Sequence, residues 1–199
     1  MLFFESDSTG QSRNPMELTV GRLLPHLEVA ASSALRQRGL TYPENWRSCP
    51  KNLLSLDIFN LATLDVFHRH VFQLDDLPNG EESIGKTRFH HLPFYVLDIW
   101  VPLDFEPTPE PERNDGGFPV ALLSCQGLLR DLDEIQKKSS MLLGGKPDGY
   151  DLMRENRKEF YRSKFSLKDE TTMLQWIWRG LHDAVQFAID HSAPLLATE

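Results

Sequence analysis

The chain lacks the features that would place it in several large classes of protein. It has only two cysteines, Cys49 and Cys125, which are too few for a disulfide framework, and it contains no C-x-x-C pair. No stretch approaches the roughly 18 consecutive apolar residues that cross a bilayer. The first residues also lack the basic and apolar regions of a secretory signal peptide. These absences predict a soluble, cytoplasmic protein that does not contact membranes.

Positive charge is also in short supply. The 21 Lys and Arg residues are outnumbered by 29 Asp and Glu residues, which gives a formal net charge of −8. An acidic surface repels nucleic-acid phosphates and anionic lipids, so binding to either is disfavoured. Opposite charges speed encounter, so a protein partner with a basic surface is favoured. A negative surface that serves solubility alone explains the charge equally well.

What remains is the composition of an ordinary globular domain. The chain is 40% hydrophobic and 25% charged, and its 199 residues are enough to bury a core without metal or disulfide bonds. Residues 1–14 are largely small and polar and predict a flexible N-terminal lead. Residues 15–199 are expected to form a single domain, because no internal repeat is present.

Apolar residues at helical spacing predict that most of this domain is helical. One helix is expected to begin at Pro15 and end near Arg38, and a largely buried one covers residues 53–73. An amphipathic helix starts at Gln126 and ends at a pair of lysines, and a solvated one covers residues 151–165. A long, central helix is expected over residues 166–191, with Ser166 and Asp169 forming a capping box.

Two segments in the middle of the chain have the composition of β-strands. Residues 94–105 are rich in aromatic and β-branched side chains, and alternation places Asp98 and Asp104 on the face opposite Ile99 and Val101. Residues 118–125 are expected to form a second strand, paired with the first as an antiparallel neighbour. The predicted fold is therefore α+β and mainly α, with helices flanking a small antiparallel sheet.

An acidic, proline-rich loop at residues 106–117 is the most unusual local feature. Between positions 75 and 115 the sequence has ten acidic and three basic residues, and prolines recur at every second position of residues 107–111. Alternating prolines favour a stiff, extended chain that loses little entropy on binding. We predict that this loop binds a partner through carboxylates and two aromatic anchors, namely Asp104, Glu106, Glu110, Glu112, Asp115, Phe105 and Trp100.

The motifs that would indicate an enzyme or a metal site are incomplete. Histidines occur in two close pairs, His68 with His70 and His90 with His91, but the H-E-x-x-H pattern is absent. Cys125 lies at a predicted strand-to-helix turn, where enzymes can display a nucleophile, yet G-x-S-x-G is not present there. We therefore predict no catalytic residue, no metal and no cofactor, and we expect Cys125 to be a buried thiol.

Three functional hypotheses follow from these features. The favoured one is a non-enzymatic, acidic protein-binding module, such as an immunity or inhibitor protein that neutralises a basic toxin or enzyme domain by direct binding. The first alternative is a small cytoplasmic hydrolase-like enzyme whose His, Asp and Cys residues meet only in the folded chain. The second alternative is a structural homo-oligomer subunit that packs its apolar C-terminal helix against a copy of itself.

Overall fold

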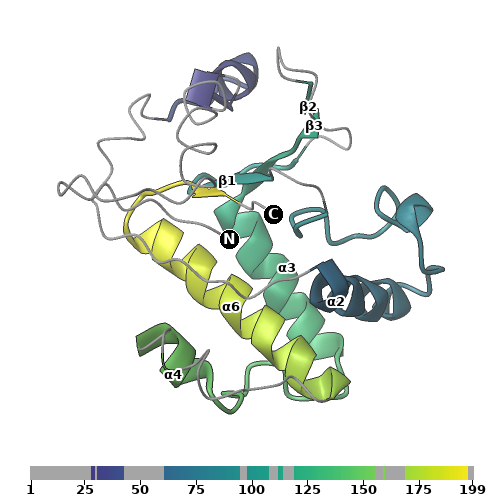
Figure 1. The fold of residues 1–199 in the computed structure, drawn as a ribbon. Helices are drawn as coiled ribbons and strands as arrows, with labels where there is room; N and C mark the ends of the chain where they lie inside the picture. The colour runs from purple at the N-terminus through teal and green to yellow at the C-terminus, as the bar shows by residue number, and fades with distance from the viewer. Residues whose placement is uncertain are drawn as a thin grey trace.

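The computed structural model describes most of the chain from residue 28 onward, namely residues 28–29, 31–42, 61–94, 98–107, 112–113, 119–155, 159 and 169–196. Helices dominate this part of the chain, which confirms the mainly α class (Figure 1). The helices are α2 (Leu61–Leu74), the 3-10 helix η2 (Glu81–Ser83), α3 (Cys125–Lys138), α4 (Tyr150–Glu155) and α6 (Glu170–Asp190). The strands are β1 (Ile99–Val101), β2 (Glu112–Arg113), β3 (Pro119–Val120), β4 (Leu122–Ser124) and β5 (Leu195–Leu196).

Helix α3 agrees closely with the helix predicted from the sequence. Ser124 is its N-cap, and the Ser124 hydroxyl accepts a hydrogen bond from the backbone N–H of Gly127 at 2.9 Å. Lys137 and Lys138 occupy the last turn, where positive charge is stabilised by the helix dipole. The predicted helix from position 126 is confirmed, and it begins one residue earlier than expected.

Helix α6 begins later than predicted. Asp169 is its N-cap, and the Asp169 carboxylate accepts a hydrogen bond from the backbone N–H of Thr172 at 2.8 Å. The expected start, Ser166, lies outside the described residues. Of the other predicted helices, the structure describes α2, α4 and the helical residues 28–29, 31–37 and 159, and most of the remaining predicted residues lie outside the described ranges.

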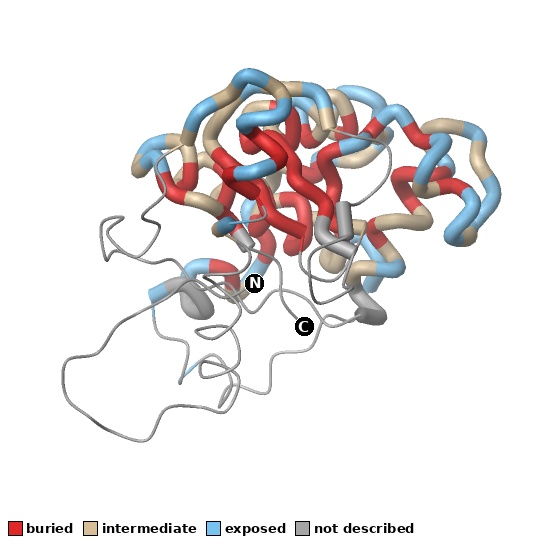
Figure 2. Tube along the Cα trace, turned by 90° about the horizontal axis from the view of Figure 1, so that it is seen from above, coloured by how far each residue is buried: buried red, intermediate tan, exposed pale blue. Residues whose placement is uncertain are grey.

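The main hydrophobic core lies where α2, α3 and α6 pack against one another (Figure 1). Buried residues gather at the centre of the described chain in Figure 2, and exposed ones line its outer turns. The Trp178 indole N–H of α6 donates to the Leu132 carbonyl of α3 at 2.9 Å, which links these two helices within the core. None of the helices in the described part is both long and apolar enough to span a bilayer.

The antiparallel pairing predicted for the two middle strands is wrong. Strand β1 pairs with β4 in parallel, with Ile99 opposite Leu122 and Val101 opposite Ser124. Strand β5 joins the other edge of β1 and runs antiparallel to it, giving the order β4-β1-β5. A parallel pair needs a connection of about a dozen residues or more, and residues 102–121 are long enough for that.

The connection between β1 and β4 contains a second, two-stranded sheet. Strands β2 and β3 form a separate antiparallel pair inside this connection, with Glu112 opposite Val120. Figure 1 shows this pair extending away from α3 and α6. The chain reverses direction between β2 and β3, and β4 then runs in the same direction as β1. The predicted strand 94–105 is described as a strand only at Ile99–Val101, and the predicted strand 118–125 divides into β3 and β4.

Both faces of the sheet are covered, which is why the predicted alternation of exposed and buried residues fails. Trp100 and Leu123 pack into the main core against the helices. Ile99, Val101 and Leu122 face a smaller cluster on the opposite side, formed with Ala31, Ala34 and Leu35. Every residue of β1 and β4 is consequently buried, as expected for parallel strands covered on both faces.

Candidate functional site

Three of the predicted binding residues, Asp104, Phe105 and Glu106, lie on a short segment that follows β1. We call residues 103–107 the acidic strap. The side chains of Asp104 and Glu106 are 61% and 84% exposed, respectively. Arg130 of α3 contacts both, because its guanidinium lies 2.7 Å from Asp104 Oδ1 and 4.0 Å from Glu106 Oε1. The strap therefore presents its carboxylates to solvent while one arginine holds it beside α3.

Phe105, between the two acids, points toward the interior. Its ring is partly buried against the smaller hydrophobic cluster. The guanidinium carbon of Arg38 lies 5.4 Å from the centroid of the ring, which is within cation–π distance. Phe105 therefore anchors the strap to the smaller hydrophobic cluster, and only part of its ring is exposed to solvent.

The prediction that Trp100 contacts a partner is wrong, because its side chain is fully buried. Its indole N–H donates a hydrogen bond to the His91 carbonyl at 2.7 Å. Trp100 was expected to be an apolar anchor for a partner, but its face of the sheet lies against the helices. Trp100 belongs to the main core instead.

The other predicted binding residues lie farther along the acidic loop. Glu112 is in β2, and its backbone pairs with Val120 of β3. Glu110 and Asp115 lie outside the described residues. Of the predicted loop 106–117, the structure thus describes residues 106–107 and 112–113, and it places Glu106 beside Arg130 of α3.

Behind the strap, His91 joins three parts of the fold. Its backbone N–H donates to Asp131 Oδ2 at 2.8 Å, and its ring Nδ1 lies 3.1 Å from the backbone nitrogen of Ser124, which donates to it. A ring nitrogen that accepts a hydrogen bond carries no proton, so the geometry requires a neutral imidazole. Burial, with Arg130 and His90 nearby, lowers the pKa of His91 to about 4, in agreement with this geometry.

Ser124, His91 and Asp131 are the residue types of a catalytic triad, but their contacts are not those of one. The Ser124 hydroxyl caps α3, and it is the Ser124 backbone N–H that reaches the His91 ring. Asp131 contacts the backbone of His91 and not its imidazole. Ser124 is also fully buried. The arrangement therefore joins β4, α3 and the loop before β1, and it does not activate a hydroxyl.

Asp131 is the titratable group of this cluster with the most unusual environment. Burial is the main cause that raises its pKa, to about 7, and the nearby carboxylates of Glu134 and Glu106 act in the same direction. The hydrogen bond from the His91 N–H and the charge of Arg130 oppose the rise. Asp131 therefore changes charge near neutral pH, immediately beside the acidic strap.

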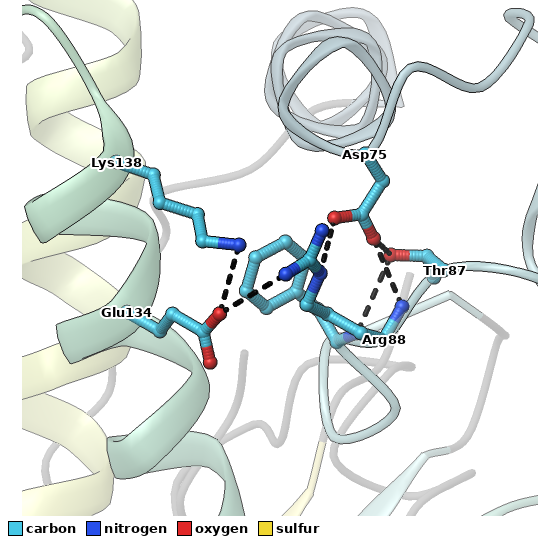
Figure 3. A network of polar contacts seen from close by, with 6 residues as sticks. Asp75, Thr87, Arg88, Glu134 and Lys138 are labelled. Carbon is cyan, nitrogen blue, oxygen red and sulfur yellow. Dashed lines mark hydrogen bonds and ion pairs between the residues drawn. The ribbon is translucent and has the colours of Figure 1, made fainter.

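A second network holds the loop that leads to His91 (Figure 3). The Asp75 carboxylate, at the end of α2, accepts hydrogen bonds from the Thr87 hydroxyl at 2.8 Å and from the Arg88 backbone and guanidinium. Arg88 also lies 3.5 Å from Glu134, which pairs with Lys138 at 3.0 Å. Burial raises the pKa of Asp75, but these hydrogen bonds outweigh it, so the pKa lies below its ordinary value.

The remaining candidates from the sequence have structural contacts. Cys125 is fully buried, and burial raises the pKa of its thiol, so little nucleophilic thiolate is present. His68 Nε2 is hydrogen-bonded to the Pro93 carbonyl and His70 Nε2 to the Ser139 hydroxyl, each at 2.8 Å. Within the described ranges, no three His, Cys, Asp or Glu side chains are placed to hold a metal ion.

Sequence reasoning missed Arg130 and Asp131 as parts of this site. Both are ordinary charged residues of an amphipathic helix, and nothing in their spacing indicates that the strap and His91 meet them. The only local signal was the serine before α3, which marks the strand-to-helix turn. Comparisons add no further assignment, because no protein-family model, curated protein or solved structure matches the chain.

Proposed function

We propose that this chain is a non-enzymatic, acidic protein-binding module that docks a basic partner through the acidic strap and the loop that follows it. In its sharpest form, the chain is an inhibitor or immunity protein that neutralises a basic toxin or enzyme domain by covering it. The observation that carries the proposal is the exposure of the strap carboxylates, 61% for Asp104 and 84% for Glu106.

The anchoring of the strap supports this proposal. Val101 holds one end in the buried sheet, Phe105 is packed against the smaller cluster, and Arg130 pairs with the carboxylates. A segment that is already ordered loses little conformational entropy when a partner binds. Exposed carboxylates on such a segment steer a basic surface toward it and pair with its cations on contact.

The acids farther along the loop would extend the same surface. Glu110, Glu112 and Asp115 follow the strap within a few residues. The region is expected to bind as one strongly negative strip, because positive side chains are rare in this part of the sequence. Pairs at its exposed rim would contribute more to the rate of association than to the affinity.

The two alternatives receive less support from the described residues. A hydrolase would need a reactive group within reach of substrate, whereas Ser124 and Cys125 are both fully buried. A homo-oligomer that pairs through α6 would need an uncovered apolar face on that helix. Nine residues of α6 are buried within this chain, and Val29 and Leu142 are the exposed large hydrophobic residues of the described part.

Charge reversal in the acidic segment tests the proposal. Tagged protein is used to capture partners from cells that naturally contain it, and each captured partner is then purified and titrated by calorimetry. Replacing Glu106, Glu110 and Glu112 by Lys should weaken binding by at least about tenfold, because attraction becomes repulsion. Raising the salt concentration should weaken the wild-type complex, since exposed charges are screened.

A matched variant separates the strip from the overall charge. Replacing the exposed acids Glu81, Glu82 and Asp148 by Lys changes the net charge by the same amount at other positions. This control should retain most of the affinity. Equal loss in both variants, or full binding by the reversed strip, would show that the strip is not the docking surface.

A further inference from the structure

A serine and a histidine meet at the C-terminal end of α3. Ser139 is the C-cap residue of this helix, and its backbone N–H donates to the Ile135 carbonyl at 2.9 Å. His70 belongs to α2, which packs beside α3 in the main core (Figure 1). The Nε2 atom of His70 lies 2.8 Å from the Ser139 hydroxyl oxygen. A base and a nucleophile are therefore in direct contact, although 69 residues separate them in the chain.

Both partners are held in place by the packing of their helices. His70 is buried, and its neighbours on α2, Phe67 and Val71, are fully buried in the main core. The cap hydrogen bond fixes the backbone of Ser139 at the point where α3 ends. Reacting groups that are already held at hydrogen-bond distance need little reorganisation before a proton moves between them.

The environment of His70 favours the form of its ring that can accept a proton. Burial lowers the pKa of His70, and the charge of Glu170 opposes that change only in part, so the imidazole is neutral at physiological pH. A neutral ring has an electron pair on one of its two nitrogens. When that nitrogen is Nε2, the Ser139 hydroxyl donates its hydrogen bond to the ring. In this tautomer, His70 can take the hydroxyl proton as Ser139 attacks an electrophile.

Access from solvent distinguishes Ser139 from the two nucleophilic groups at the start of α3. Ser124 and Cys125 are fully buried. Ser139 is only partly buried, and the next residue, Ser140, is exposed. A small reagent can therefore approach Ser139 from solvent, while the imidazole that contacts its hydroxyl remains largely shielded from water.

We propose that Ser139 is a nucleophilic modification site that takes an acyl group from an activated carboxylic ester, with His70 as its base. The Ser139 oxygen forms a bond to the carbonyl carbon, and its proton passes to His70 Nε2. The bond from that carbon to the leaving oxygen then breaks, and the departing alcohol takes the proton from His70. The products are O-acyl-Ser139, the free alcohol and a neutral imidazole. The acyl group stays on the chain, so the proposal requires no turnover and does not depend on what the acidic strap binds.

Acetylation of the whole protein by p-nitrophenyl acetate at neutral pH tests the proposal. The reagent also acetylates exposed lysines and histidines, so mass spectrometry of the peptide that contains Ser139 and Ser140 follows each serine separately. General-base assistance typically accelerates a reaction by 100-fold or more, so Ser139 should react at least about tenfold faster than Ser140. Exposure alone would favour Ser140, because it is the more exposed of the two.

Variants of both histidine and serine separate the base from its surroundings. In His70→Gln, acetylation of Ser139 should slow at least about tenfold, because the base is lost. His90→Gln is the matched control, since it removes an exposed histidine elsewhere and should leave the rate at Ser139 unchanged. Ser140→Ala should also leave that rate unchanged. Circular dichroism checks that each variant is folded.

Two results would overturn the proposal. Equal rates at Ser139 and Ser140 in the wild-type protein would show that contact with the imidazole does not activate the hydroxyl. An unchanged rate at Ser139 in folded His70→Gln would show that His70 is not its base and that the hydrogen bond is only structural. Should His70→Gln fail to fold, the comparison of the two serines in the wild-type protein still decides the question.

Discussion

The ring of His91 lies directly over Gly127, in the first turn of α3. A Cβ atom at position 127 would come within 2.2 Å of His91 Nε2, far closer than atoms can approach without movement. The glycine therefore allows the loop before β1 to rest on α3. This contact places His91 where its backbone reaches Asp131 and its ring reaches Ser124.

Gly127→Ala should consequently destabilise the protein. Alanine favours a helix over glycine by about 1 kcal/mol, but the added methyl group would displace the His91 ring. We expect a net loss of about 1–3 kcal/mol in the free energy of unfolding, measured by urea denaturation. Gly85→Ala is the matched control, because nothing lies within 4 Å of its built Cβ. A Gly127→Ala protein as stable as the control would show that the ring can move aside freely.

The close contact between His91 and Gly127 illustrates what the sequence could not predict. The apolar spacing and the terminal lysines of α3 are local signals, so the helix was predicted to within one residue of its start. The contact with His91 joins residues far apart in the chain, and no local pattern encodes it. The exposed acids of the strap were found because charge and proline content are visible without a fold, whereas Arg130 and Asp131 were found only in the structure.

The prediction of strand exposure and direction failed for a related reason. The alternation of residues 94–105 indicated a sheet with one exposed face, and that expectation placed Asp98 and Trp100 outside. Both are fully buried, and Trp100 packs into the main core, so the face that was expected to meet solvent lies against the helices. Which elements cover a sheet is decided by long-range packing, so strand composition was informative while strand exposure and direction were not.

Asp75→Asn should weaken the anchor between α2 and the loop that leads to His91. The substitution preserves the shape of the side chain but removes its charge and one acceptor oxygen, while Thr87 and Arg88 still need acceptors. We expect a loss of about 1.5–3 kcal/mol in the free energy of unfolding, as for other hydrogen bonds to charged groups. The loss should be measured by denaturant titration at neutral pH.

The effect of Asp75→Asn should also depend on pH. The pKa of Asp75 in the folded protein lies below its unfolded value of 3.8. Its contribution to the free energy of unfolding is therefore complete above pH 3.8, and it declines as the pH falls through the folded pKa. The difference between variant and wild type should therefore shrink in acid. Asp76→Asn is the control, because its backbone φ of 54° suits asparagine. Equal destabilisation by both substitutions would contradict the anchoring role of Asp75.

Cys125 should be unreactive in the native protein. The thiolate is the nucleophilic form of cysteine, and burial both raises the pKa of Cys125 and blocks access to it. In a Cys49→Ser background, labelling by a thiol reagent should be slow in buffer and should become fast only at denaturant concentrations that unfold the chain. Rapid, complete labelling without denaturant would show that the turn before α3 opens readily.

His91 and Asp131 should have opposite effects on stability as the pH changes. The folded pKa of Asp131, about 7, exceeds its unfolded value of 3.8, so its contribution is complete below pH 3.8 and is lost as the pH rises through 7. The folded pKa of His91, about 4, is below its unfolded value of 6.5, so its contribution is complete above pH 6.5 and is lost as the pH falls through 4.

Between pH 4 and 6.5 these two contributions nearly cancel, because folding in effect moves one proton from His91 to Asp131. The pair should therefore add little pH dependence to wild-type unfolding over that range. Asp131→Asn removes the Asp131 contribution, so only that of His91 remains. The free energy of unfolding of this variant should fall by up to about 3 kcal/mol as the pH decreases from 6.5 to 4. His91→Asn, whose amide oxygen can replace Nδ1 as an acceptor, should show the opposite slope. Denaturant titrations at several pH values measure both slopes, and two variants with parallel, flat profiles would contradict this exchange of protonation.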